Sequence, residues 1–306
     1  MVGPKVTPGR PTISLVGLAS IAFFPALWFG IGATALAGQT QHLESAKPTG
    51  QPIAPFFEGW YSNPDGTYTF SFGYHNFNTE ETVHIPLGAG NRIEPAQFDR
   101  GEQPTLYPAR PSRRERGVFT VTVPGEFGER RQPVVWTVTA HGTTYSVPAK
   151  IGVDAYELDY APRAGGSVAP LVGFESDGER GQNPQGMVWS QTLEAAVGQP
   201  LEVRVWVSDP SARPDDQTRP DAGVDVPIGL RWFTHRGPVE ASFLEAQGEV
   251  GPLVGNSEDS WATMATFTEP GDYVLRVRAD NWTARDSSAG NQCCWTNGYV
   301  RVSVRP

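Results

Sequence analysis

Hydrophobic and polar residues alternate with a period of two along most of this chain, which is the pattern of β-strands with one buried face. In residues 67–75 every second position is a large aromatic residue: Tyr68, Phe70, Phe72 and Tyr74. Glycine (34 residues) and proline (28 residues) make up about a fifth of the chain, compared with roughly 12 % in an average protein, which favours turns over long helices. The chain is therefore predicted to be all-β.

Two groups of short strands separated by turn signals predict two antiparallel β-sandwich domains. The first covers residues 53–152, and in it Trp60-Tyr61 and the strand 67–75 are expected to form a hairpin. The second covers residues 195–306. Residues 153–194 are predicted to be a linker with edge strands.

The N-terminus has the order of an export signal. Two basic residues precede an uncharged apolar stretch that ends in Ala35-Leu36-Ala37, as in a cleaved signal peptide. We expect residues 1–37 to be a signal peptide and residues 38–52 a flexible tether, with the mature protein periplasmic, on the cell surface or secreted. The alternative is a membrane anchor, because residues 13–36 are long enough to span a bilayer.

The segment 265–280 contains Pro270-Gly271-Asp272-Tyr273, where a Pro-Gly turn precedes a strand that begins with tyrosine. This segment resembles the penultimate strands of PKD-type and related bacterial immunoglobulin-like domains. The Trp-Asp-Phe-Gly-Asp-Gly motif of PKD domains is absent, so the resemblance is to the wider immunoglobulin-like group. It implies that Trp232 is the buried tryptophan of the third strand, that Tyr273 forms a tyrosine corner, and that the protein serves in extracellular display, adhesion or an accessory role.

Charge and motifs argue against several classes of function. The chain has 24 basic and 33 acidic residues and a formal charge of −9, so it lacks the basic surface that nucleic acid requires. The signatures of serine hydrolases, zinc peptidases, P-loop proteins and dinucleotide-binding proteins are absent. His75 and His84 could share one side of a hairpin as metal ligands, with ordinary surface positions as the alternative. We expect no catalytic residues and no enzymatic activity.

One loop carries the candidate metal site. It is rich in proline and contains Asp209, Asp215, Asp216, Asp221 and Asp225. Extracellular modules bind calcium with oxygen ligands, so calcium is the one cofactor that the sequence offers. A solvated acidic loop is the alternative.

A second charged segment lies in the first sandwich. Arg110, Arg113, Arg114 and Arg116 surround Glu115 within a proline-rich, irregular stretch, residues 92–116. Such a basic segment could receive an anionic polymer. A solvated loop is the alternative.

The two cysteines of the chain are adjacent, at Cys293 and Cys294, between Trp282 and Trp295. Lone thiols rarely survive in exported proteins, and a bond between these two would be a vicinal disulfide. A buried reduced pair and an intermolecular bridge are the alternatives. The four residues are the candidate ligand-binding platform, because aromatic faces offer a large apolar contact area, although tryptophans can also close the end of a core.

These observations predict a non-catalytic exported protein that binds an extracellular protein or a glycan. Its contact loops would be the platform around Trp282 and Trp295 and the segment 92–116. An accessory or degenerate module acting on polysaccharide and a structural envelope component are the alternatives. Membrane contact is expected only through residues 13–36, if they are not removed.

Overall fold

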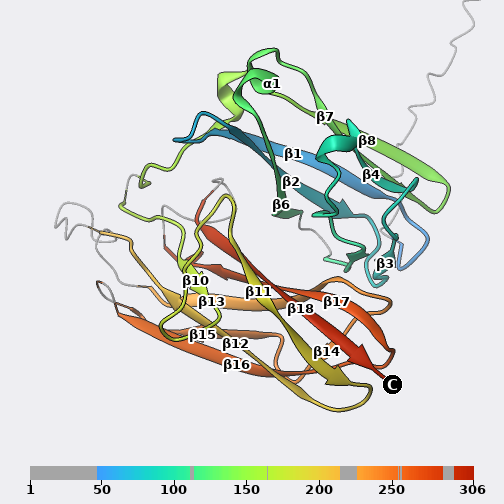
Figure 1. Ribbon diagram of the computed structural model, residues 1–306, viewed down its shortest axis with the longest axis vertical. Helices are drawn as coiled ribbons and strands as arrows, with labels where there is room; N and C mark the ends of the chain where they lie inside the picture. Colours follow the sequence, from blue (N-terminus) through green and yellow to red (C-terminus); the bar gives the residue numbers. More distant parts are fainter. Residues whose placement is uncertain are drawn as a thin grey trace, which may run out of the picture. The chain divides into compact units, whose positions relative to one another are not determined.

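Nearly all regular structure in this protein is β (Figure 1). The computed structural model describes residues 47–110, 114–163, 165–213, 226–253, 255, 257–284 and 293–306. The helices among these residues are the five-residue α1 (Gly125–Glu129) and two 3-10 turns, Ala96–Phe98 and Asp154–Tyr156. None of the described helices is long and apolar enough to cross a membrane. The prediction of an all-β chain is confirmed.

The first sandwich packs a four-stranded sheet on a three-stranded one. The four-stranded sheet has the order β6 (Glu115–Val123), β2 (Tyr68–Asn76), β1 (Ile53–Ser62) and β9 (Glu157–Leu158). The other has the order β4 (Asn91–Glu94), β7 (Val134–Ala140) and β8 (Thr143–Ala149), and β3 (Val83–His84) pairs with β5 (Leu106–Tyr107). Strands β1 and β2 form the predicted hairpin, with Trp60 opposite Phe70. The core is aromatic, with the buried Trp136 against Phe72 and Phe119.

The second sandwich has a four-stranded and a five-stranded sheet. The first has the order β10 (Leu171–Gly173), β12 (Leu201–Ser208), β16 (Glu258–Thr266) and β14 (Ser242–Phe243). The second has the order β11 (Met187–Ala196), β18 (Trp295–Arg305), β17 (Gly271–Asp280), β13 (Ile228–Arg236) and β15 (Gln247–Val250). Alternate residues of the two sheets, such as Val205 on β12 and Leu275 on β17, fill the core between them.

Two features of the second sandwich are those of immunoglobulin-like domains. Trp232 lies in the middle of β13 and is 2 % exposed. Tyr273 lies at the start of β17, and its hydroxyl donates a hydrogen bond to the carbonyl of Glu269 at 2.9 Å, which is a tyrosine corner. The predicted burial of both residues is confirmed.

The segment 153–194 contains β9, β10 and most of β11, and each of these strands lies at the edge of its sheet. Strand β11 runs parallel to β18. Most of its side chains are exposed or half-buried, and this is why the alternation of buried residues is too weak there to define the strand from sequence.

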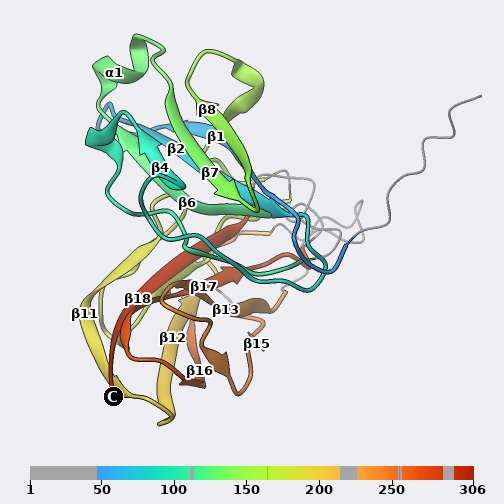
Figure 2. The same ribbon diagram turned by 90° about the vertical axis from the view of Figure 1, so that its right-hand side faces the viewer.

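Part of the outer face of the five-stranded sheet packs against the first sandwich. The described residues of both sandwiches belong to one compact unit, Ser45–Pro306. Figure 2 shows β6 next to β18, and two hydrogen bonds join these strands: Asn297 Nδ2 donates to the carbonyl of Gly117 at 2.6 Å and the Tyr299 hydroxyl to the carbonyl of Val118 at 2.7 Å. The middle of the polar face of β17 is thereby buried, at Arg276, while Arg278 and Asp280 stay half-buried.

This packing determines the surroundings of the outer face of β17. The alternation along the strand places Arg276 and Arg278 opposite the core. Arg276 is nevertheless only 2 % exposed. The period of the strand identifies the face, and the first sandwich buries it.

Candidate functional site

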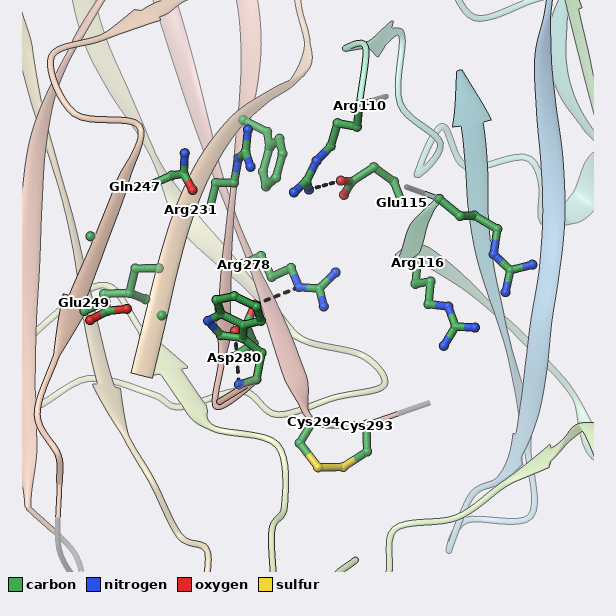
Figure 3. Close-up of a pocket in the computed structure, with 16 residues that line it drawn as sticks. Arg110, Glu115, Arg116, Arg231, Gln247, Glu249, Arg278, Asp280, Cys293 and Cys294 are labelled. Atoms are coloured by element: carbon green, nitrogen blue, oxygen red, sulfur yellow. Dashed lines mark hydrogen bonds and ion pairs between the residues drawn. A yellow bond between two sulfur atoms is a disulfide. The ribbon is translucent and has the colours of Figure 1, made fainter. Parts of the chain in front are cut away.

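A cleft with a volume of about 810 Å³ lies between the two sandwiches, within the range of small-molecule sites. The first sandwich contributes Arg110, Arg114, Glu115 and Arg116 to its lining (Figure 3). The second contributes Gly229, Leu230, Arg231, Phe233, Gln247, Gly248, Glu249, Arg278, Asp280, Trp282, Cys293 and Cys294. Strand periodicity explains the lining residues of β13 and β17. Alternate residues of β13 (Arg231, Phe233) and of β17 (Arg278, Asp280) point to the outer face of the sheet.

Glu115 is a buried counter-ion at the wall of the cleft. Its side chain is 2 % exposed and forms ion pairs with Arg110 and with Arg276, the latter at 3.5 Å. Burial favours the neutral acid, but Arg276 and Arg110 together outweigh it and lower the pKa of Glu115 below its ordinary value. Glu115 is therefore ionised at neutral pH.

Three guanidinium groups surround the ring of Phe233. Their central carbons lie 4.3 Å (Arg276), 5.2 Å (Arg231) and 6.0 Å (Arg110) from the ring centroid, at distances where cations are attracted to an aromatic face. Glu115 forms ion pairs with two of them, Arg110 and Arg276.

Among the described residues, Arg231 is the cation of this group that forms no ion pair, although the charge of Glu115 acts on it from a greater distance. In the described part of the chain, no ion pair or hydrogen bond joins its side chain to another residue. Burial lowers the pKa of Arg231, and the positive charge of Arg110 lowers it further. The region around Phe233 therefore has an excess of positive charge.

The floor of the cleft contains a second charged pair. Arg278 lies over the ring of Trp295, 4.5 Å from its centroid, and its Nε is 3.2 Å from a carboxylate oxygen of Asp280. Asp280 also accepts a hydrogen bond from the backbone N–H of Trp282 at 3.3 Å. Burial raises the pKa of Asp280, although Arg278 acts in the opposite direction.

On the other side of the cleft, Glu58 of β1 lies close to two arginines. Arg114 is 3.4 Å and Arg116 4.0 Å from its carboxylate, and the Arg114 guanidinium covers the ring of Phe56 at 4.7 Å. Counted over the described residues, the lining holds five arginines and three carboxylates. A positive cleft in a chain of formal charge −9 focuses an attractive field on anions.

The arginine segment predicted from sequence is part of this site. Arg110, Arg114 and Arg116 all line the cleft, whereas Arg113 lies outside the described residues. Arg231 and Arg278 were not among the site residues predicted from sequence, because alternation along the two strands places them only on the face opposite the core. The available signal was the recurrence of arginine on the outer phase of both strands, together with Phe233 on the same face.

The candidate platform is only partly formed. Cys293 and Cys294 are joined to each other by a disulfide and line the cleft with Trp282, which is 47 % exposed. Trp295 is 4 % exposed, so the expectation of two exposed tryptophans is wrong. Gly117 explains this burial: its φ is +51°, and a Cβ there would lie 2.7 Å from the ring of Trp295. The first sandwich thus covers Trp295.

The candidate calcium site is described only at one residue. Asp209 is buried, accepts the backbone N–H of Ser211 at 3.0 Å and forms an ion pair with Arg213 at 2.9 Å. Asp215, Asp216, Asp221 and Asp225 lie outside the described residues. The described part of the chain contains no group of three or more His, Cys, Asp or Glu side chains that could hold a metal ion. His75 packs edge-on against Phe77 at 4.7 Å, and His84 is exposed.

No protein-family model matches this chain, and no curated protein matches it. Among solved structures, the D0-D1 domain of intimin is similar over 82 % of this chain and 97 % of its own length, with 10 % identity and a TM-score of 0.25. Domains 4 and 5 of the S-layer protein SbsC are similar over 84 % of this chain and 100 % of theirs, with 10 % identity and a TM-score of 0.23.

A CARDB domain from Pyrococcus furiosus is similar over 37 % of this chain and 81 % of its own length, with 18 % identity and a TM-score of 0.25. We do not assign the fold of this chain from TM-scores of this size. The immunoglobulin-like fold is assigned from the strand order of this chain, the buried Trp232 and the Tyr273 corner.

Proposed function

We propose that this chain is a non-catalytic, exported binding protein whose ligand is anionic and enters the cleft between the sandwiches. The observation that carries the proposal is the concentration of arginine there, with five arginines and three carboxylates in the described lining of a chain whose formal charge is −9. Attraction confined to one cleft guides an anion to it.

The charge distribution favours a small ligand over the anionic polymer that the arginine segment alone suggests. A long polyanion would extend beyond the cleft over the remaining surface, which carries the net negative charge of the chain. Like charges repel within a Debye length of about 8 Å at physiological ionic strength. We infer a ligand with one or a few anionic groups.

Export is supported by the sequence of residues 1–37, which lie outside the described part of the chain. Protein recovered from the envelope or the medium of the producing cell is expected to begin near residue 38. A first residue of Met1 in N-terminal sequencing would contradict cleavage, and a cytosolic pool would contradict export.

Binding is tested by titration calorimetry of the mature chain with sulfate, citrate and digalacturonate at 20 and 200 mM NaCl. We expect at least one of these anions to bind, more weakly at the higher salt concentration because ions screen the attraction. If none binds at either salt concentration, the proposed function is wrong.

A matched pair of variants locates the binding. Gln247 is an exposed residue of the cleft, and Gln199 is an exposed residue in the turn after β11. Gln247→Glu adds a negative charge to the cleft and should weaken anion binding, whereas Gln199→Glu adds the same charge elsewhere and should not. Equal effects of the two variants would place the ligand outside the cleft.

A polysaccharide hydrolase is the second candidate, because Asp280 and Glu249 line the same cleft as the exposed Trp282, and glycoside hydrolysis uses a pair of carboxyl groups. Chromatography of the saccharide after incubation decides between the two. Unchanged saccharide supports binding alone. Shorter products that disappear in Asp280→Asn would establish catalysis.

A further inference from the structure

Two of the three arginines around Phe233 bind one carboxylate of the protein itself, that of Glu115. Arg110 and Arg276 bind the side chain of Glu115, while the third guanidinium, that of Arg231, has no such partner among the described residues. Figure 3 shows Arg110 and Arg231 extending into the same part of the cleft from its two sides. A carboxylate on a ligand would neutralise the charge of Arg231. It would also accept two parallel hydrogen bonds from the planar guanidinium.

The same cleft offers an aromatic surface. Trp282 is 47 % exposed, and its indole atoms lie 3.3 Å from the position that a Cβ at Gly229 would occupy. The absence of a side chain at Gly229 therefore leaves room for the indole beside β13. Gly229 and Arg231 share one face of this strand two residues apart, so they are separated by about 7 Å.

Acceptors for hydroxyl groups line the cleft as well. Gln247 and Glu249 are exposed residues of β15, and both line the cleft. The carboxylate of Glu249 accepts hydrogen bonds, and the amide of Gln247 both donates and accepts them. A ligand carrying only a charge would leave these groups unused.

From this arrangement we propose that the ligand is a short saccharide containing a carboxylated sugar of the uronic acid type. Its carboxylate binds between Arg231 and Arg110, a sugar ring stacks on Trp282, and hydroxyl groups bond to Gln247 and Glu249. This inference rests on the proposed function and specifies its ligand.

The probes are digalacturonate, its dimethyl ester and succinate. The ester keeps the sugar rings and removes the charge, whereas succinate keeps the two carboxylates and removes the rings. We expect digalacturonate to bind at least tenfold more tightly than either control. Tight binding of succinate would contradict a saccharide ligand, and equal binding of the ester would contradict recognition of the carboxylate.

The variants are Arg231→Gln, Arg231→Lys and Trp282→Ala, with Arg301→Gln as the control. Arg301 is exposed on β18 and is not among the residues that line the cleft. We expect a loss of tenfold or more in digalacturonate affinity for Arg231→Gln and Trp282→Ala. Arg231→Lys should lose part of the affinity, because an ammonium cannot form the paired hydrogen bonds, and Arg301→Gln should behave as the wild type.

Thermal unfolding of each variant establishes that it is folded. Arg231→Lys preserves the charge and decides the role of Arg231 if Arg231→Gln does not fold. Digalacturonate binding that is sensitive to Gln247→Glu but unchanged by both Arg231 variants would overturn this subsite and leave the proposed function standing. If no anion binds to the wild type, both proposals are wrong.

Discussion

Glu115 lines the cleft and forms ion pairs with residues of both sandwiches. It begins β6 of the first sandwich, yet one of its two ion-pair partners, Arg276, belongs to β17 of the second. Both side chains are 2 % exposed. Removing one partner of a buried ion pair leaves the other charge uncompensated, and this is costly.

We predict that Glu115→Gln lowers the free energy of unfolding by about 3 to 5 kcal/mol, because it leaves Arg276 buried without a carboxylate. Denaturant unfolding measures this loss. Glu194→Gln is the control, since its pair with Arg305 is exposed at both ends and should be worth less than about 1 kcal/mol. Equal losses in the two variants would show that the Glu115 pairs contribute no more than a surface contact.

His235 gives the stability of the protein a dependence on pH. It is buried, its Nε2 is 2.8 Å from the carbonyl of Glu102, and its ring packs against Tyr299. Burial lowers the pKa of His235 well below the ordinary value of 6.5, and Arg276 and Arg236 lower it further. The unfolded chain therefore takes up the proton more readily than the folded one.

The direction in which stability changes with pH follows from this difference in proton uptake. The contribution of neutral His235 to stability is fully present above pH 6.5 and is lost as the pH falls below it. We predict that the free energy of unfolding decreases between pH 7 and pH 5, by at most about 1.4 kcal/mol per pH unit from this group. His235→Asn should reduce that slope, while the exposed His84→Asn should not. A slope unaffected by His235→Asn would contradict the assignment.

At the scale of elements, β13 serves two purposes at once. One face carries Ile228, Leu230 and Trp232 into the core of the second sandwich. The other carries Arg231 and Phe233 into the cleft. A substitution on the core face of β13 is therefore expected to affect the positions of the cleft residues on its other face.

We predict that Trp232→Ala lowers the free energy of unfolding by roughly 3 to 5 kcal/mol, as for other large buried aromatics. The loss arises from the apolar contacts of the indole and from the cavity left behind. Thermal or denaturant unfolding measures it, with the exposed Tyr145→Ala of β8 as the control. Unchanged unfolding of Trp232→Ala would contradict the packing of the core.

The Cys293–Cys294 disulfide precedes β18 and lines the cleft. Because two adjacent residues close almost no loop, the bond constrains the unfolded chain very little. We predict that replacing both cysteines with serine changes the free energy of unfolding by less than about 1 kcal/mol and weakens ligand binding instead. Thiol titration of the wild-type protein, denatured without a reducing agent, should detect almost no free thiol. Two titratable thiols would show that the bond is absent in solution.

At the scale of the whole molecule, the contact between the sandwiches is polar and specific. Besides the bonds of Asn297 and Tyr299 to β6, the backbone N–H of Thr105 donates to the carbonyl of His235 at 2.9 Å. These contacts cross between segments far apart in the sequence, so they form only when both sandwiches are folded.

We predict that the wild-type protein unfolds in one cooperative transition, because each sandwich supports the other through these bonds. The double variant Asn297→Ala/Tyr299→Phe removes two of them and should separate the transition into two. Calorimetry measures this as a ratio of calorimetric to van't Hoff enthalpy that rises above one. Two transitions already present in the wild type would show that the sandwiches are energetically independent.

The periodicity of the sequence by itself determined the all-β class, many of the core strands and the burial of Trp232 and Tyr273, but not the short core strands β4 and β5, which lie almost wholly in the stretch 92–116 predicted to be irregular. It could do so because burial on one face of a strand is recorded locally, in every second residue. The arginines at 110, 114 and 116 were also recognisable as a charged segment from their spacing alone.

Only the tertiary structure decided what lies on the outer face of β13 and β17. A polar residue opposite the core has the same sequence signature whether it faces water or a second domain, so Arg231, Arg276 and Arg278 could not be assigned from periodicity. The packing of the sandwiches buries Arg276 against Glu115, covers Trp295 with Gly117 and brings Arg110 next to Arg231. These pairs are separated by more than a hundred residues, and local patterns carry no information on such distances.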